Sequence, residues 1–88
     1  MAIPALIGDD VTATAVHSDA VTLELHAAKA YPPGRPLTIT LWPGSADALA
    51  LAARCIGSKR REDGSYAVRT RLVNLARDAR ETLLRALG

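Results

Sequence analysis

The segment that decides the predicted fold is LALAARCIGSKRREDGSYAVRTRL, residues 49–72 of an 88-residue chain. Apolar and polar residues alternate on both sides of Asp63-Gly64, a pair that favours a two-residue turn between antiparallel strands. This turn predicts which residues face each other: Cys55 faces Leu72, Gly57 faces Thr70, and Lys59 faces Val68. We therefore expect one long hairpin.

The predicted hairpin has an apolar face and a basic face. The apolar face collects residues from both strands: Leu49, Leu51, Ala53, Cys55, Val68, Thr70 and Leu72. The opposite face carries four arginines: Arg54, Arg60, Arg69 and Arg71. A shift of the pairing by one residue would turn the arginines of one strand inward, so the hydrophobic pattern and the turn chemistry support one another.

The residues before the hairpin predict three more strands, at residues 11–16, 21–25 and 37–41, where apolar and polar residues alternate. The prolines of residues 31–36 exclude a helix or a central strand between the second and third of these. The alanines and leucines of residues 46–53 also favour a helix. The hairpin register favours a strand from about residue 49 instead, with a loop or helical turn before it.

A C-terminal helix completes the expected fold. Asn74 is placed to cap it, and apolar residues then repeat at three- and four-residue spacing over about residues 75–87. The expected fold class is mainly β: a small antiparallel β-barrel of five or six strands, with one C-terminal α-helix closing one end. Residues 1–10, which are largely apolar and include Pro4, are expected to form an N-terminal arm, and residues 11–88 the barrel domain.

The composition indicates one small cytoplasmic domain. A single cysteine cannot form an internal disulfide, and the apolar run at residues 1–7 is too short, and lacks the basic flank, for a secretory signal. No window approaches the roughly 20 apolar residues that cross a bilayer, so we expect no membrane insertion. Residues 1–44 hold four acidic residues against two basic ones, whereas residues 45–88 hold nine basic residues against five acidic ones. A basic surface of this kind can attract nucleic acid, nucleotide phosphates or an acidic protein.

The residues that carry chemistry in enzymes form no recognisable pattern. His17 and His26 lie at no metal-ligand spacing, and Cys55 is expected to be a core thiol because it shares a face with leucines. The carboxylates are not paired as general acid and base catalysis requires. We therefore expect no catalytic residue, no metal ligand and no cofactor-binding residue, and a protein that is not an enzyme.

The candidate interaction surface joins one aromatic residue to the basic face of the hairpin: Trp42, Arg54, Arg60, Arg69 and Arg71. Trp42 falls on the polar face of the strand at residues 37–41, where it can anchor a partner, although a lid over the barrel edge is the alternative. For the arginines the alternative is a solvated sheet face. The chain has only three aromatic residues, which argues against a groove for single-stranded nucleic acid. Strand edges that pair between copies would make a homo-oligomer.

The order of these parts resembles the PilZ domain family, small bacterial β-barrels of cyclic di-GMP signalling. The shared parts are a strand, turn and strand over residues 16–25, Pro32-Pro33-Gly34 before the alternating strand at 37–41, the long hairpin with Ala67-Val68-Arg69, and a short final helix. The resemblance covers about 75 residues. It implies a barrel fold and a role in the control of motility, pili or polysaccharide.

Family members that bind cyclic di-GMP use Arg-x-x-x-Arg in the N-terminal arm and Asp/Asn-x-Ser-x-x-Gly in the first strand and turn, where guanidinium groups pair with phosphates and stack on guanine. The first arginine of this chain is Arg35. Aligned on the residues from Val21, the second motif holds Ala15, His17 and Ala20 at its Asp/Asn, Ser and Gly positions. The resemblance thus implies a degenerate member that acts through a protein partner without binding cyclic di-GMP. Two alternatives stay open: a sensor that binds cyclic di-GMP through other arginines, and a nucleic-acid-binding barrel.

Overall fold

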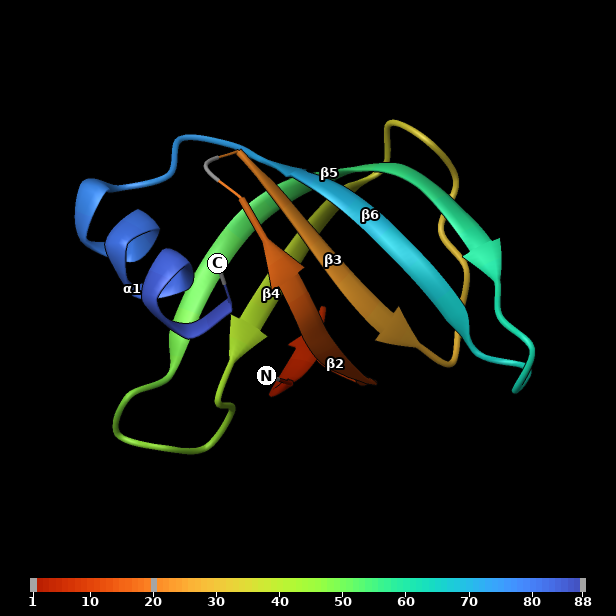
Figure 1. The fold of residues 1–88 in the computed structure, drawn as a ribbon, viewed down its shortest axis with the longest axis horizontal. Helices are drawn as coiled ribbons and strands as arrows, with labels where there is room; N and C mark the ends of the chain where they lie inside the picture. The colour runs from red at the N-terminus through yellow and green to blue at the C-terminus, as the bar shows by residue number, and fades with distance from the viewer. Residues whose placement is uncertain (1, 20, 88) are drawn as a thin grey trace.

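Within residues 2–19 and 21–87, which the computed structural model describes, six antiparallel strands close into a barrel and one helix lies at its end (Figure 1). The elements are β1 (Ile3–Ile7), β2 (Val11–Ser18), β3 (Thr22–Ala27), β4 (Pro36–Leu41), β5 (Leu49–Arg60), β6 (Tyr66–Leu72) and α1 (Arg77–Leu87). Around the barrel the strand order is β1-β2-β3-β6-β5-β4, and pairing of β1 with β4 closes the ring. The predicted fold class, a small antiparallel barrel with one C-terminal helix, is confirmed.

Residues 3–7, expected to belong to an arm outside the barrel, form the strand that closes it. β1 pairs with β2 from Ile3 opposite Ala15 to Ile7 opposite Val11, and with β4 from Ala5 opposite Leu41 to Ile7 opposite Ile39. Ile3, Ala5 and Ile7 are buried in alternation.

The presence of Pro4 argues against a strand at residues 3–7, because proline lacks the N–H that a residue in a central strand donates. The Pro4 carbonyl accepts the N–H of Trp42 at 2.9 Å, beyond the last paired residue of β4. The N–H and the carbonyl of one strand residue point to the same side of the strand. At Pro4 the position without an N–H therefore lies at the end of the β4 ladder, where no further strand residue needs a donor. A proline is tolerated there.

The β5–β6 hairpin pairs in a different register from the one predicted. Its loop has three residues, Glu62-Asp63-Gly64: the N–H of Arg61 donates to the Ser65 carbonyl at 2.7 Å, and Gly64 has a φ of 88°. The facing residues are Cys55 with Thr70, Gly57 with Arg69, and Lys59 with Ala67. The predictions of Cys55 opposite Leu72, Gly57 opposite Thr70 and Lys59 opposite Val68 are therefore wrong.

A β-bulge at Ile56 accounts for the rest of the shift. The register changes between Cys55 and Gly57, so one extra residue lies in β5. Before the bulge the predicted faces hold, because Leu51, Ala53 and Cys55 are buried and Arg54 is exposed. Beyond it the alternation is inverted: Ser58, not Lys59, lies opposite Val68.

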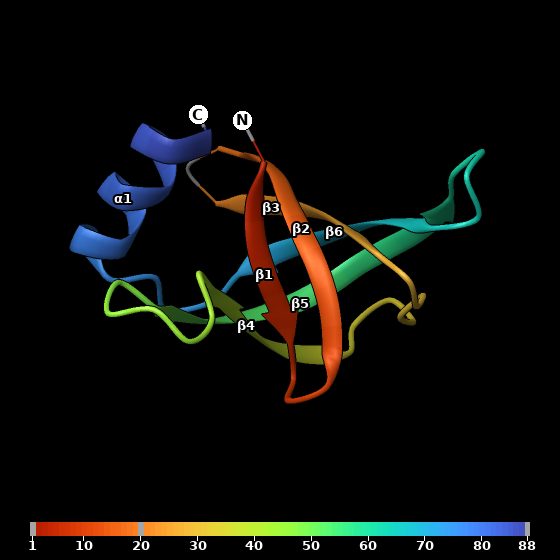
Figure 2. The ribbon, with the colours of Figure 1, turned by 90° about the horizontal axis from the view of Figure 1, so that it is seen from below.

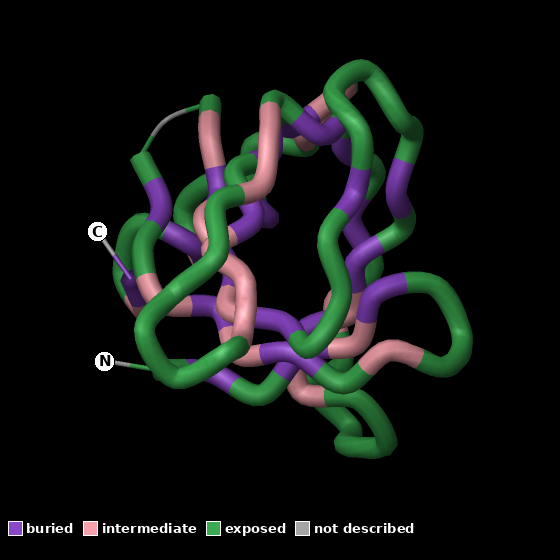
Figure 3. The backbone as a smooth tube through the Cα atoms, turned by 90° about the vertical axis from the view of Figure 1, so that its right-hand side faces the viewer, coloured by how far each residue is buried: buried purple, intermediate pink, exposed green. Residues whose placement is uncertain are grey.

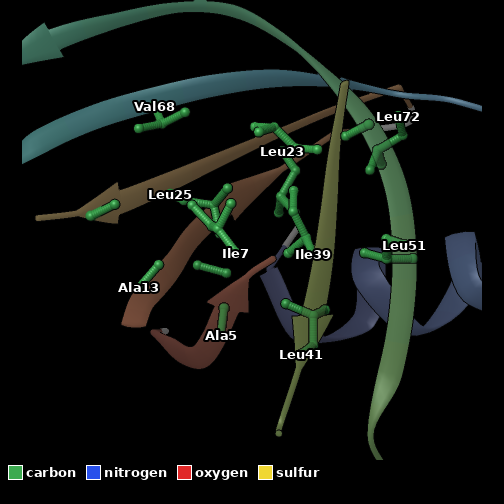
Figure 4. Packing of buried hydrophobic residues seen from close by; sticks show 14 of the residues in the cluster. Ala5, Ile7, Ala13, Leu23, Leu25, Ile39, Leu41, Leu51, Val68 and Leu72 are labelled. Carbon is green, nitrogen blue, oxygen red and sulfur yellow. The ribbon is translucent and has the colours of Figure 1, made fainter. Parts of the chain in front are cut away.

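Small and branched aliphatic side chains fill the barrel, because the chain has no phenylalanine (Figure 4). Buried and exposed residues alternate along the strands (Figure 3). Two buried hydroxyls are satisfied inside the protein: Thr70 Oγ1 donates to the Leu23 carbonyl at 2.9 Å, and Ser18 Oγ donates to the Thr22 carbonyl at 2.9 Å. The barrel interior is a packed core.

The final helix begins later than expected. Asn74 does not cap it, because its φ is 51° and the first turn closes with the Arg80 N–H donating to the Ala76 carbonyl at 3.0 Å. Helix α1 runs from Arg77 and turns Ala79, Leu83 and Leu87 into the core. Within the described part of the chain, no helix is long and apolar enough to span a bilayer.

The β3–β4 connection is fastened to β5 near the bulge. Ser58 Oγ accepts the N–H of Tyr31 at 2.9 Å and donates to the Tyr31 carbonyl at 3.0 Å. The Gly34 N–H donates to the Cys55 carbonyl at 2.7 Å. The Tyr31 side chain is buried, and burial raises the pKa of its phenol, with the Asp10 charge adding to the effect. Cys55 lies in the core, as predicted for a structural thiol.

Candidate functional site

Two of the predicted arginines lie directly opposite each other on the outside of the barrel. Arg54 of β5 faces Arg71 of β6, and both are exposed. The row continues on either side to Pro36 of β4 and Thr22 of β3. The two cations thus occupy the middle of a four-strand outer surface.

Two more cations share this surface. Arg69 lies two residues from Arg71 on the same face, between Glu24 of β3 and Gly57 of β5. Lys59 faces Ala67 in the next row, because the bulge moves it outward. In the structure the basic face therefore consists of Arg54, Lys59, Arg69 and Arg71, with Lys59 in the place predicted for Arg60, and the name is used for these four residues from here on. Strict alternation along a hairpin without a bulge places Lys59 on the core side, so the sequence did not predict Lys59 as a member of this surface.

None of the cations of the basic face forms an ion pair with a carboxylate of the described residues, although Glu24 of β3 lies opposite Arg69. The ion pairs found among those residues join Arg61 to Asp63 at 3.2 Å and Arg77 to Glu81 at 3.5 Å. Arg54 Nη1 donates to the Gly34 carbonyl at 3.2 Å, which holds the side chain beside β4. Like charges directly opposite in a sheet cost a few tenths of a kcal/mol to about 1 kcal/mol. An anionic partner would offset that repulsion.

The other two residues of the predicted surface lie elsewhere. Arg60 faces Tyr66, on the opposite side of the hairpin alternation from Arg69 and Arg71. Trp42 follows β4 and packs against the core at the end of the barrel where α1 lies. The structure therefore brings together Arg54, Arg69 and Arg71, and separates them from Arg60 and Trp42.

The tip of the β5–β6 hairpin projects beyond the barrel on the side away from α1 (Figure 2). A shallow hollow of about 510 Å³ lies there, lined by Lys59, Arg60, Arg61, Glu62, Asp63 and Ala67. Asp63 holds the turn together: its carboxylate accepts the Ser65 Oγ–H at 2.6 Å and the Ser65 N–H at 2.9 Å, and these bonds lower its pKa. Arg61 is engaged with Asp63, so the run of three cations at residues 59–61 is partly neutralised.

The region aligned with the second nucleotide motif is built differently from a ligand site. Ala15 is fully buried in the core, and His17 is exposed opposite Glu24. Ala20 lies outside the described residues. The turn is held by Asp19, whose carboxylate accepts the N–H groups of Val21 at 2.9 Å and Thr22 at 2.8 Å. The carboxylate is therefore occupied by its own turn.

No group of three or more histidine, cysteine, aspartate or glutamate side chains in residues 2–19 and 21–87 is arranged to hold a metal ion. The geometry of the basic face suits electrostatic recognition: exposed guanidinium groups on a rigid sheet can form paired hydrogen bonds with carboxylates or phosphates. No protein-family model matches the chain, and no curated protein is similar to it at a significant level.

Proposed function

We propose that this chain is a PilZ-like, non-catalytic regulatory module that acts by protein–protein contacts in cyclic di-GMP-linked control of motility, pili or polysaccharide. The main support is the pair Arg54 and Arg71, which oppose each other across neighbouring strands with Arg69 beside them; none of the three forms an ion pair in the described part of the chain. The repulsion between Arg54 and Arg71 would be offset by negative charge, so this surface is complementary to an acidic patch on another protein.

The placement of the aromatic residues favours a protein partner over single-stranded nucleic acid. Tyr31 is buried, while Trp42 and Tyr66 pack against the core. The basic face therefore has no aromatic side chain on which bases would stack, although stacking supplies about 1 to 3 kcal/mol per base in single-strand binders.

Cyclic di-GMP binding is disfavoured for a separate reason. Residues 3–7, which lie where the resemblance expects the arm, form the barrel strand β1, and residues 1–34 contain no arginine. Ala15 points into the core and offers no polar group. Two missing arginines, at about 1.5 to 3 kcal/mol for each charged hydrogen bond, weaken the binding of a dinucleotide by orders of magnitude.

Calorimetric titration of the chain with cyclic di-GMP at low salt tests the nucleotide part of the proposal. We expect no heat of binding at micromolar concentrations. Saturable binding in that range would overturn the adaptor interpretation in favour of a sensor. Binding of single-stranded DNA or RNA that falls steeply with salt, and is lost when Arg69→Ala is combined with Arg71→Ala, would favour the nucleic-acid alternative.

Photo-crosslinking in the native cell tests the protein part. A photoreactive residue at exposed Ala52 reports from the strand that carries Arg54, and one at exposed Thr12 reports from β2, three strands away around the barrel. We expect a specific adduct from position 52 and none from position 12. Arg54→Glu with Arg71→Glu should abolish the adduct.

Arg80→Glu with Arg85→Glu on the exposed side of α1 is the matched control, because it changes the net charge equally. An adduct that survives reversal of the basic face would count against this surface, as would one lost equally in both double variants.

A further inference from the structure

A second surface, at the opposite end of the molecule from the hairpin tip, has a different chemistry from the basic face. The loop that follows β4 and the helix α1 lie at the same end of the barrel (Figures 1 and 2). Between them is an open hollow of about 600 Å³, lined by Trp42, Ser45, Asp47, Leu49 and Thr82. It combines an indole, a carboxylate, an aliphatic side chain and two hydroxyls.

The indole is held in place by the backbone around it. Trp42 has a φ of 49°, a conformation that costs a bulky residue free energy and that persists only where the surroundings enforce it. Its N–H donates to the Pro4 carbonyl at 2.9 Å, and its carbonyl accepts the Ser45 N–H at 3.1 Å. The side chain is half-buried and packs against the core. One part of the ring therefore supports the barrel and the rest borders the hollow.

The backbone of Asp47 is tied to the same loop, whereas its carboxylate has no partner among the described residues. The N–H of Asp47 donates to Ser45 Oγ at 3.1 Å, which ties the residue to the same loop. Its carboxylate forms no ion pair and accepts no hydrogen bond from residues 2–19 or 21–87. An indole beside an unpaired carboxylate is the combination that binds a cation, through the ring face and through charge-assisted hydrogen bonds.

We propose that this hollow receives an arginine side chain of a partner polypeptide. A planar guanidinium can lie on the Trp42 ring while it forms paired hydrogen bonds with Asp47, which an ammonium group cannot do in the same way. Leu49 lies in the lining and can contact the methylene groups of the incoming side chain.

A polypeptide fits better than a free amine because of the remaining groups. Ser45 Oγ retains a donor, since it accepts the Asp47 N–H, and Thr82 Oγ1 retains acceptor capacity, since it donates to the Asp78 carbonyl at 2.9 Å. These hydroxyls can bond to the peptide groups beside the bound arginine. The hollow beside Trp42 would bind a positively charged group, whereas the basic face would bind a negatively charged one. The two surfaces would therefore bind different partner groups.

The single tryptophan makes the proposal directly measurable, because all indole fluorescence of the chain comes from Trp42. The probe is an acetylated and amidated Gly-Ser-Arg-Ser-Gly peptide, titrated against the full chain, with the same peptide carrying norleucine as comparison. We expect a saturable change in emission with a dissociation constant on the order of 1 mM for the arginine peptide, and binding at least about tenfold weaker for the norleucine peptide.

Two variants and one control variant locate the site. Asp47→Asn should weaken arginine-peptide binding by about fivefold or more, because the side chain is exposed and only its charge changes. Asp9→Asn, at an exposed carboxylate in the β1–β2 turn, should leave the affinity unchanged. Calorimetry with Trp42→Phe, after its folding is checked by circular dichroism, should show weaker binding than the parent.

Equal affinity for the arginine and norleucine peptides would overturn the proposal. So would an Asp47→Asn variant that binds as well as the parent, or the absence of any saturable signal up to about 10 mM peptide. Failure here would leave the crosslinking expected from the basic face unaffected, because the two surfaces share no residue.

Discussion

At the scale of single residues, a carboxylate shapes the β2–β3 turn. Asp19 accepts two backbone N–H groups, from Val21 and Thr22, and the bond from Val21 is the largest cause of its lowered pKa. Two donors that would otherwise lack a partner in the turn are satisfied by one ionised side chain. This turn is therefore stabilised by the charged form of Asp19.

The sign of the pH dependence follows. The pKa of Asp19 in the folded chain lies below its ordinary value of 3.8, so its contribution to stability is present above that value and is lost as the pH falls through the folded pKa. Asp19→Asn keeps an oxygen acceptor but does not titrate. We expect the urea midpoint to fall between pH 5 and pH 2.5 more steeply in the parent than in this variant.

Asp63 provides a second case of the same effect. Its pKa is lowered first by the hydroxyl of Ser65 and then by the Ser65 N–H, so Asp63→Asn should flatten the acid dependence in the same direction. Parallel pH profiles for the parent and both variants would show that these turns do not contribute to acid sensitivity.

At the scale of elements, the β5–β6 hairpin contains two glycines, of which only one needs the left-handed backbone conformation that glycine allows. Gly64 closes the three-residue loop with a φ of 88°, whereas Gly57 lies in β5, just beyond the bulge, without a positive φ. A methyl group added at either position meets no heavy atom within 4 Å. Any difference between the two alanine variants therefore arises from the backbone and not from a clash.

Gly64→Ala should lower the free energy of unfolding by about 1 kcal/mol or more, because an L residue pays to enter the left-handed region. Gly57→Ala should leave it unchanged or raise it by up to about 1 kcal/mol, because alanine loses less backbone entropy. Chemical denaturation of both variants measures the difference. Equal destabilisation, or the reverse order, would mean that the loop is not built as described.

At the scale of the whole molecule, α1 shares one core with the barrel. Leu83 is 0% exposed and belongs to the buried cluster, while its neighbour Leu84 is 41% exposed. The two residues have the same helix propensity and differ only in what they contact. They form a matched pair for asking how much of the total stability the helix contributes.

Leu83→Ala should cost about 2 to 5 kcal/mol, a large share of the 5 to 15 kcal/mol that stabilise a typical domain. Leu84→Ala should cost less than about 1 kcal/mol. Thermal unfolding followed by circular dichroism and by Trp42 fluorescence should give coincident transitions, because helix and barrel unfold together. Separate transitions, or similar costs for the two variants, would indicate a helix that is not part of the core.

Much of the candidate site could be predicted from the alternation of apolar and polar residues along the two strands of the hairpin. Arg54, Arg69 and Arg71 share the outer face because strand residues point alternately to opposite sides, a property that the chain carries at every point. Lys59 did not follow, since a bulge inverts the alternation beyond Ile56, and the one residue that hints at an extra residue there is Gly57, an isolated glycine inside a strand. Trp42 was grouped with the arginines because the alternation of residues 37–41, continued by one residue, places it on the polar face, whereas its left-handed backbone brings it to the hollow beside α1.

The sequence by itself determined the alternation within five of the six strands, the buried faces up to the bulge, and the closing helix, because periodicity is encoded locally. Only the tertiary structure decided that residues 3–7 close the ring between β2 and β4, and that Asp47 and Thr82 border one hollow. Those outcomes depend on which segments meet in space. Neighbour choice and curvature in a barrel are set by all strands together, not by any one of them.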